Sequence, residues 1–409
     1  MLEQPLYTEP NKKKTNKALI WIMVIMIIFI TNSCAFMGGA VVIGVIQELD
    51  GYSVDVDTSD LESTVTDIYE VLDKNALVPP DKDKLEESVI KGILLSLDDP
   101  YAYYFTPEEY QSFIETEEGS FGGIGVVLGE NENGQTYVVN VMEDTPAFDA
   151  GVKEGDIFYS VDGVKKDKWT TEQIMKLVRG EPGTKVVVGF LRGDVIKPVE
   201  LEITREIIKV PNIEKDMLGE NKDIGYVRLY QFNMDSARDV ESNIQTLLNE
   251  GATSIILDLR ENPGGLLQTS VDIVSLFVES GDAVIIQERE SDEYSYQVSG
   301  NKITDVPVVV LIDGNSASAS EIVAGALQDY ERATIVGETS FGKGTVQNFV
   351  EMDNGGAMKF TIAHYLTPKR QIIDGNGVTP DVEVKMEVSA QNEYETDTQL
   401  QKAVEILDK

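Results

Sequence analysis

The sequence is poor in the residues that many enzymes use for catalysis. Its 409 residues include one histidine, His364, and one cysteine, Cys34. A cysteine nucleophile or a metal site built from histidine and cysteine needs more of these residues than the chain offers outside its apolar N-terminal stretch. A serine–histidine pair would depend on His364 alone. That residue lies in an alternating run, residues 359–366, which is typical of an ordinary strand position.

Positive charge is also scarce. The chain has 34 Lys and Arg residues against 71 Asp and Glu residues, so its formal net charge is −37. Such a protein repels nucleic acid and anionic membrane surfaces, so we expect no nucleic-acid partner. Beyond residue 46 the chain contains no cysteine. Its stability must therefore come from packing and not from disulfides.

An uncharged stretch near the N-terminus predicts a membrane anchor. Four lysines lie within residues 1–17, and residues 18–46 contain no charge. About 20 apolar residues span a bilayer, and positively charged flanks stay in the cytoplasm. We therefore expect a cytoplasmic segment at 1–17, a single transmembrane helix at 18–46 in the cell membrane, and an extracytoplasmic remainder. A cleaved signal peptide, with residues 18–30 as its apolar part, and a lipid on Cys34 are the alternatives.

Residues 58–117 read as a helical region. Apolar residues recur at helical spacing twice, as Leu61, Val65, Ile68 and Leu72 and then as Leu85, Val89, Ile93 and Leu97. Two such helices are too small for a core of their own. They are expected to pack on another domain or on a second copy of the chain, which makes a homo-oligomer a prediction. The aromatic stretch 99–106 that follows is interpreted as a turn that plugs a core, with a place in a groove as the alternative.

Residues 118–206 change to the period of strands. A glycine turn, Phe121–Leu128, leads into a strand, and further strands are expected at 136–141, 185–191 and 199–204, with a helix at 171–179. A glycine turn at an open strand edge can bind the carboxylate of a peptide C-terminus while the peptide adds a strand. The whole pattern resembles a PDZ domain. The resemblance implies that Gly123, Ile124, Gly125 and Val126 bind the free C-terminus of a protein or peptide.

Residues 207–409 alternate between strands and helices, which predicts an α/β domain with a parallel-rich sheet. One buried strand, residues 254–260, runs into a turn with Gly264 and Gly265. Two glycines at such a place can present backbone N–H groups as an oxyanion hole, where one donor contributes roughly 3 kcal/mol to transition-state stabilisation. The same glycines can also serve only the geometry of a strand-to-helix turn.

A second stretch of this domain combines serines with a glycine-flanked lysine. Ser316, Ser318 and Ser320 precede a predicted helix, and Lys343 follows between two glycines. A lysine can activate a serine if its pKa falls from about 10.4 to about 7, a change of roughly 4 kcal/mol that burial can supply. Gln347 lies on the same side as Lys343 if residues 345–350 form a strand, although a straight strand would separate them by roughly 13 Å. Direct contact between them requires a bend at the glycines. A capping box formed by Ser318 and Glu321 is the alternative reading, and the residues alone leave the three serines equal.

Three motifs together resemble those of the C-terminal processing peptidases, also called tail-specific proteases. They are residues 260–265, 316–321 and 341–347, and the resemblance extends over residues 58–409. It implies a serine endopeptidase with a PDZ domain that needs no metal and no cofactor. In that family pattern Ser318 is the nucleophile, Lys343 the general base and Gln347 the group that orients the lysine. The backbone N–H groups of Gly264 and Ala319 form the oxyanion hole.

Two rival functions remain at this stage. Residues 340–343 satisfy the Ser-x-x-Lys signature of penicillin-interacting enzymes, but the companion motifs of those enzymes are missing and the signature precedes a strand. Ser340 stands where the C-terminal processing peptidases often have threonine. A membrane-tethered PDZ adaptor without activity is the other rival. The expected architecture is thus an α/β peptidase core at 207–409, a PDZ-like β-rich domain at 118–206, a helical region at 58–117 and one transmembrane helix.

Overall fold

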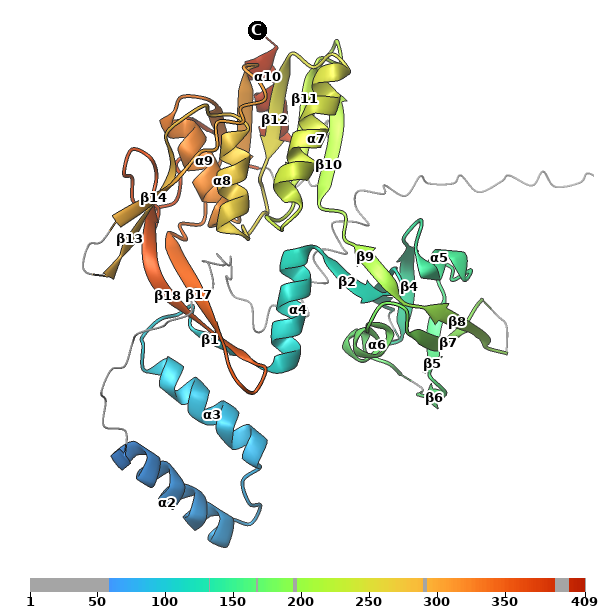
Figure 1. The fold of residues 1–409 in the computed structure, drawn as a ribbon. Helices are drawn as coiled ribbons and strands as arrows, with labels where there is room; N and C mark the ends of the chain where they lie inside the picture. The colour runs from blue at the N-terminus through green and yellow to red at the C-terminus, as the bar shows by residue number, and fades with distance from the viewer. Residues whose placement is uncertain are drawn as a thin grey trace, which may run out of the picture. The chain divides into compact units, whose positions relative to one another are not determined.

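The computed structural model describes residues 59–131, 133–166, 168–193, 197–289, 293–386 and 397–408. The predicted transmembrane helix at 18–46 and the segment 1–17 lie outside the described residues. Within the described ranges, no helix is both long and apolar enough to cross a membrane. The described residues divide into two compact units, drawn in Figure 1. We call Phe121–Lys209 the PDZ-like unit and the rest, residues 59–120, 210–386 and 397–408, the core unit.

The PDZ-like unit is built on an antiparallel sheet. Its elements are β2 (Ser120–Gly123), β3 (Val126–Glu130), β4 (Thr136–Val141), α5 (Pro146–Asp149), β5 (Ile157–Val161), β6 (Val164–Lys165), α6 (Thr171–Val178), β7 (Lys185–Leu191), β8 (Val199–Thr204) and β9 (Glu206–Lys209). The sheet order is β3-β4-β5-β7-β8, with β6 beside β5, while β2 pairs with β9. Phe158 and Phe190 meet edge to face in its core, 4.8 Å apart. In this order β3 is an edge strand.

The core unit contains a mostly parallel sheet of six strands. In spatial order they are β10 (Ile213–Leu218), β11 (Ile224–Leu229), β12 (Ser254–Asp258), β15 (Val308–Ile312), β16 (Thr334–Gly337) and β19 (Val382–Glu383). Only β10 runs antiparallel to its neighbour. Every residue of β12 and β15 is buried, as expected for parallel strands covered on both faces.

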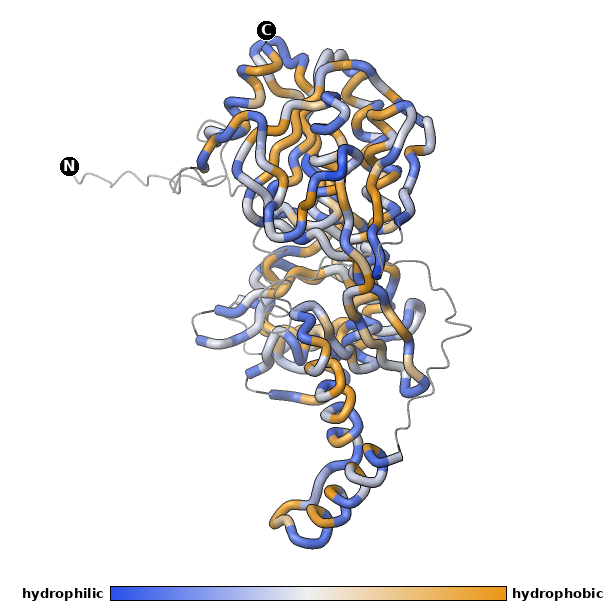
Figure 2. The backbone as a smooth tube through the Cα atoms, turned by 90° about the vertical axis from the view of Figure 1, so that its left-hand side faces the viewer, coloured by the Kyte–Doolittle hydropathy of each residue, from blue (hydrophilic) through white to orange (hydrophobic). Residues whose placement is uncertain are grey.

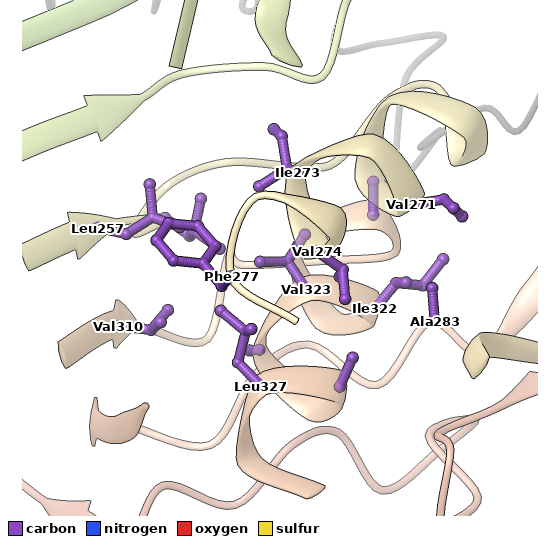
Figure 3. Packing of buried hydrophobic residues seen from close by; sticks show 14 of the residues in the cluster. Leu257, Val271, Ile273, Val274, Phe277, Ala283, Val310, Ile322, Val323 and Leu327 are labelled. Atoms are coloured by element: carbon purple, nitrogen blue, oxygen red, sulfur yellow. The ribbon is translucent and has the colours of Figure 1, made fainter. Parts of the chain in front are cut away.

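Helices cover both faces of this sheet. They are α7 (Ser236–Asn249), α8 (Leu267–Ser275) and α9 (Ala319–Asp329) on one face and α10 (Thr398–Leu407) on the other. Successive side chains of each strand point to opposite faces of the sheet, so the same strands contribute to the cores on both faces. Leu257 and Val310 belong to the cluster with α7, α8 and α9, whereas Ile256 packs with α10. Figure 3 shows Leu257 and Val310 beside Phe277 and the side chains of α8 and α9. Figure 2 shows long orange, hydrophobic segments within the core unit and blue residues at many of its turns.

A second, antiparallel sheet adjoins the parallel one within the core unit. It has the order β1 (Tyr103–Phe105), β18 (Ala357–Leu366), β13 (Asp282–Glu288) and β14 (Glu293–Gln297), and β17 (Thr345–Glu351) pairs with β18 as a hairpin. The long strand β18 therefore contacts β17 along one edge and both β1 and β13 along the other. The loop between β16 and β17, which contains Lys343, is attached to this sheet by a hydrogen bond from the Tyr365 N–H to the Gly344 carbonyl, 2.9 Å long.

The helical region consists of α2 (Ser59–Asn75), α3 (Lys82–Leu95) and α4 (Pro107–Glu118). Ile90 and Leu94 of α3 pack against Tyr104, whereas α2 has no buried residue among those described. Leu61, Ile68 and Val71, on α2, are each more than half exposed, at 57%, 54% and 59%.

Most of the predicted elements are confirmed, but the aromatic stretch needs a correction. The strands predicted at 136–141, 185–191 and 199–204 have these bounds in the structure. Residues 103–105 form the strand β1 and not only a turn, because they pair with β18. Phe105 does enter a core, where it lies 5.4 Å from Phe113 and 5.8 Å from Phe349, ring to ring. The edge strands β10 and β14 were not predicted.

Candidate active site

Ser318 lies immediately before α9 in a backbone conformation that residues with a side chain rarely adopt. Its φ is 53° and its ψ is −109°. Such a conformation costs on the order of 1–3 kcal/mol and occurs preferentially at functional sites. The Oγ atom of Ser318 is buried and has no hydrogen-bond partner among the described residues. A buried hydroxyl that stabilises nothing in the resting protein is available for chemistry.

The two flanking serines differ from Ser318 in this respect. The Ser316 hydroxyl donates to the carbonyl of Leu259 at 2.8 Å, and the Ser320 hydroxyl donates to the carbonyl of Asn262 at 2.9 Å. Both bonds attach the start of α9 to the loop that follows β12. The hydroxyls of Ser316 and Ser320 thus stabilise the local structure, whereas that of Ser318, between them, has no partner among the described residues.

Lys343 lies in the loop before β17 and is almost fully buried, with 1% of its surface exposed. Burial, and to a lesser extent the positive charge of Lys359, lower the pKa of its amine from 10.5 to about 7, while the carboxylates of Glu321 and Asp99 act in the opposite direction. The Nζ atom lies 4.8 Å from the centre of the Tyr101 ring. A lysine in this state can accept a proton near neutral pH.

The glycines beside Lys343 allow the loop to pack closely. Gly342 has a φ of 87°, and a Cβ there would lie 3.1 Å from the backbone nitrogen of Gly377. A Cβ on Gly344 would lie 2.3 Å from the backbone nitrogen of Asp374. The absence of a side chain at both positions thus allows the loop to pack closely on residues 374–377.

Two residues connect the main chains of Ser318 and Lys343. The Glu321 Oε2 atom accepts the N–H of Ser318 at 2.8 Å and the N–H of Lys343 at 2.9 Å. The Tyr365 hydroxyl lies 3.1 Å from the backbone carbonyl oxygen of Ser318 and also donates to the backbone carbonyl oxygen of Lys343. Residues 25 positions apart in the chain are therefore neighbours, joined through one carboxylate and one phenol.

Gln347 is fully buried on β17 but does not bond to the lysine through its oxygen. Its Nε2 atom donates to Thr345 Oγ1 at 2.9 Å, and its Oε1 atom has no hydrogen-bond partner among the described residues. The pairing of β17 with β18 shifts register between Val346 and Gln347, because β18 carries one extra residue, Ile362, at this point. The orienting role of Gln347 stays a prediction.

The predicted oxyanion donors lie at two turns of the core unit. Gly264 has a φ of 103°, and Gly265, at 140°, leaves no room for a side chain because a Cβ would lie 2.2 Å from the Phe232 carbonyl oxygen. The Gly264 N–H donates to Asn262 Oδ1 at 2.9 Å. The Gly264 N–H can donate to a developing oxyanion only if its hydrogen bond to Asn262 breaks. Ala319 is the first residue of α9, where N–H groups point toward the helix start. The oxyanion hole also stays a prediction.

The predicted peptide-binding residues belong to the PDZ-like unit. Gly123 ends β2, Val126 begins β3, and Ile124 and Gly125 form the turn between them. Ile124 is buried in the unit's core, with 1% of its surface exposed, so its side chain does not form a surface contact for a ligand. Because β3 is an edge strand, its outer side can pair with an added strand.

Sequence reasoning missed several residues that surround the base. Tyr365 and Lys359 lie on β18 and are buried, and Tyr101 precedes β1. The alternation within residues 359–366 carried a signal, because it puts both residues on one face of the strand. His364 lies on the opposite face and is exposed, 3.7 Å from an Asp374 carboxylate oxygen. Within the described ranges no three His, Cys, Asp or Glu side chains are placed to bind a metal ion.

Comparisons with known proteins agree with this fold. Residues 223–384 match the model of peptidase family S41, and residues 122–203 match that of the PDZ domain. The carboxy-terminal-processing protease of Bartonella bacilliformis is 39% identical over 325 residues, which cover 78% of this chain and 74% of that one. The carboxyl-terminal-processing protease of a Synechocystis species is 34% identical over 78% of this chain and 76% of its own. A solved photosystem II D1 C-terminal processing protease matches with a TM-score of 0.51 and 25% identity, over 95% of this chain and 99% of that one.

The protein is therefore a serine peptidase that carries a PDZ domain. It belongs to peptidase family S41, among the carboxy-terminal-processing proteases. The predicted resemblance to the C-terminal processing peptidases is confirmed, and so is the prediction that the chain is a serine peptidase. Its substrates are accordingly proteins or peptides.

Proposed function

We propose that Ser318 and Lys343 form the catalytic pair of this peptidase. The observation that carries the proposal is a buried lysine, with a pKa lowered to about 7, whose main chain is joined through Glu321 and Tyr365 to a serine with an unpartnered Oγ. The neutral amine takes the Ser318 hydroxyl proton as Oγ attacks the scissile carbonyl carbon. The resulting oxyanion accepts a hydrogen bond from the Ala319 N–H. It accepts a second one from the Gly264 N–H once that group no longer donates to Asn262.

The remaining steps return the enzyme to its first state. The protonated Lys343 gives its proton to the departing amine, which breaks the peptide bond and leaves an ester on Ser318. The neutral lysine then takes a proton from water, and the hydroxide oxygen attacks the ester carbon. The bond between that carbon and Ser318 Oγ breaks as Oγ recovers its proton from the lysine, and the product leaves as a carboxylic acid. Gln347 orients the amine during these transfers. No metal or cofactor enters any step.

We further propose that the PDZ-like unit selects substrates by their C-termini. Backbone groups of Gly123, Ile124, Gly125 and Val126 bind the terminal carboxylate, and the adjoining residues pair with the edge of β3. The support is the position of β3 at the sheet edge and the glycine turn that precedes it.

The place of action is part of the same proposal. The uncharged stretch at 18–46, preceded by lysines, supports a single-pass anchor in the cell membrane with the peptidase outside the cytoplasm. The exposed apolar side chains of α2 support self-association through the N-terminal helices. Membrane fractionation of the full chain tests the anchor: detergent, and not high salt, should release it. Light scattering of the chain without residues 1–46 tests the oligomer, and a monomer would contradict that part.

The catalytic assignment is tested by comparing Ser318→Ala, Lys343→Met and Ser340→Ala on a tailed peptide. The first two should abolish cleavage while thermal unfolding stays cooperative. Ser340→Ala should keep measurable activity, because the Ser340 hydroxyl already donates to Glu321 and accepts the Val378 N–H. Those bonds leave it no role as a penicillin-reactive nucleophile, so labelling by penicillin is not expected. Full activity of Ser318→Ala would overturn the assignment and favour another nucleophile, whereas a wild-type chain without activity would favour the adaptor.

A further inference from the structure

The Glu321 carboxylate has a role that a helix cap alone does not require. It is fully buried, and each of its two oxygens accepts two hydrogen bonds. Oε2 accepts the N–H groups of Ser318 and Lys343 described above. Oε1 accepts the Ser340 hydroxyl at 2.6 Å and the Gly342 N–H at 2.7 Å. Three of the four donors come from the loop of the base and one from the nucleophile.

All four partners are donors, which fixes the charge of the group in this arrangement. Backbone N–H groups can only donate. The Ser340 hydroxyl donates to Glu321, and its oxygen accepts the N–H of Val378 at 2.6 Å. A protonated carboxyl group would have to turn one O–H toward a donor and would lose at least one bond. The arrangement therefore belongs to the ionised carboxylate, although burial raises the pKa of Glu321.

A second capping box in the same unit shows what a purely structural glutamate looks like. Glu109 of α4 accepts the Thr106 N–H at 2.9 Å, and the Thr106 hydroxyl accepts the Glu109 N–H at 3.3 Å. Both residues lie at the surface. Glu321 differs because it is fully buried and because it also binds a loop 21 residues further along.

We propose that Glu321 is a positioning residue of the peptidase, which uses an ionised carboxylate to fix the main chains of Ser318 and Lys343 relative to each other. This inference rests on the proposed function of the Ser318–Lys343 pair. A displacement of about 1 Å between reacting groups can cost on the order of a hundredfold in rate. The carboxylate joins the nucleophile to the loop of the base in a single rigid group, with the Tyr365 phenol as the second connection.

The negative charge of Glu321 also acts on the base. It favours the protonated form of Lys343, together with Asp99, while Lys359 opposes it. The other titratable groups that feel the Glu321 charge are the phenols of Tyr101 and Tyr365. Removing the charge should therefore lower the pKa of Lys343 and move the acid side of the activity profile to lower pH. A glutamate whose charge did not act on Lys343 would not change this midpoint.

The test compares Glu321→Gln with Glu109→Gln, which is the same change in a capping box remote from the pair. For Glu321→Gln we expect kcat to fall at least tenfold with KM changed less than threefold. The midpoint of the rise of kcat/KM with pH should move to lower pH. Glu109→Gln should leave all three quantities unchanged. A Glu321→Gln enzyme with wild-type kcat and midpoint would overturn the inference.

Two further outcomes are decided by additional variants. If Glu321→Gln does not unfold cooperatively, Ser340→Ala becomes the test, because it removes one of the four donors and retains the carboxylate. A fall of kcat by a few fold at constant KM supports positioning, and unchanged kcat refutes it. If Ser318→Ala or Lys343→Met retains activity, the proposed function itself fails. If both abolish activity and Glu321→Gln does not alter it, only the inference about Glu321 fails.

Discussion

The pKa of Lys343 allows a quantitative prediction about the base. Burial and the charge of Lys359 lower it from 10.5 to about 7. At about 1.4 kcal/mol per tenfold change, retaining the proton on this amine costs roughly 5 kcal/mol more than in water. At pH 7 about half of the molecules then carry the neutral amine, against about one in 3000 for an ordinary lysine. The base is thus ready for proton transfer without a histidine.

The substitution Lys359→Met tests the electrostatic part of this account. Lys359 is buried, with its Nζ 5.6 Å from the centre of the Phe105 ring, and methionine is an unbranched apolar replacement that can fill this space. Loss of its positive charge makes the protonated form of Lys343 less unfavourable, so the pKa of Lys343 rises. Because only the neutral amine is active, kcat/KM rises with pH through this pKa. The rise should move to higher pH by roughly one unit, the effect of about 1.4 kcal/mol between charges in partly buried surroundings.

The measurement is kcat/KM for a short fluorogenic peptide from pH 5 to pH 9. Lys91→Met serves as the control, because Lys91 lies on the surface of α3 in an ion pair with Glu87. The control should reproduce the wild-type profile. A Lys359→Met profile that coincides with the wild type would refute the charge effect. A wild-type rate that is flat from pH 5 upward would show that Lys343 is not the titrating base.

Three other substitutions have expected outcomes. Ser318→Gly removes backbone strain of about 1–3 kcal/mol, whereas the extra chain entropy of glycine in the unfolded state opposes folding by about 0.5–1 kcal/mol. Tm should therefore rise by a few degrees while cleavage stops. An unchanged or lower Tm would contradict the strain. Gly125→Val places a Cβ 2.3 Å from that of Thr145 at a φ of 84°, so a Ser318→Ala chain carrying it should lose affinity for a tailed peptide in fluorescence anisotropy, and retained affinity would exclude this turn as the binding site. Burial raises the pKa of Glu117 to about 8, so the folded state retains this proton more tightly than the unfolded state and loses stability as pH rises from about 4.5 to 8. Glu117→Gln does not lose stability in this way, so its Tm should match that of the wild type at pH 4 and exceed it at pH 9. If the two proteins had the same Tm at both pH values, the raised pKa of Glu117 would be contradicted.

The sequence predicted the elements of the fold because their signals are local. The apolar strands β12 and β15 and the amphipathic helix α7 follow from composition and periodicity within a few residues. Edge strands such as β14, whose residues are mostly polar, carry no such signal. The strand β1 was read as a turn because its three residues form a strand only through pairing with β18, more than 250 residues later.

The site was predictable only in part, for the same reason. The serines and the glycine-flanked lysine are visible as a motif, but their separate duties are not. Which hydroxyl lacks a partner depends on the carbonyls of Leu259 and Asn262, which belong to a different loop. The burial that lowers the pKa of Lys343 comes from tertiary packing, and the rings and charges around it come from β18 and from Tyr101. Glu321 appeared in the sequence as a cap, and only the folded chain shows the loop that it binds.

The central claim is that Ser318 is acylated with Lys343 as its base, and peptide mapping of the enzyme after reaction with a serine-directed covalent probe tests it most directly. The account predicts a single adduct on Ser318 whose rate of formation rises with pH through about pH 7, and no adduct in Lys343→Met. An adduct on Ser316, Ser320 or Ser340, or labelling of Ser318 at an unchanged rate in Lys343→Met, would contradict it.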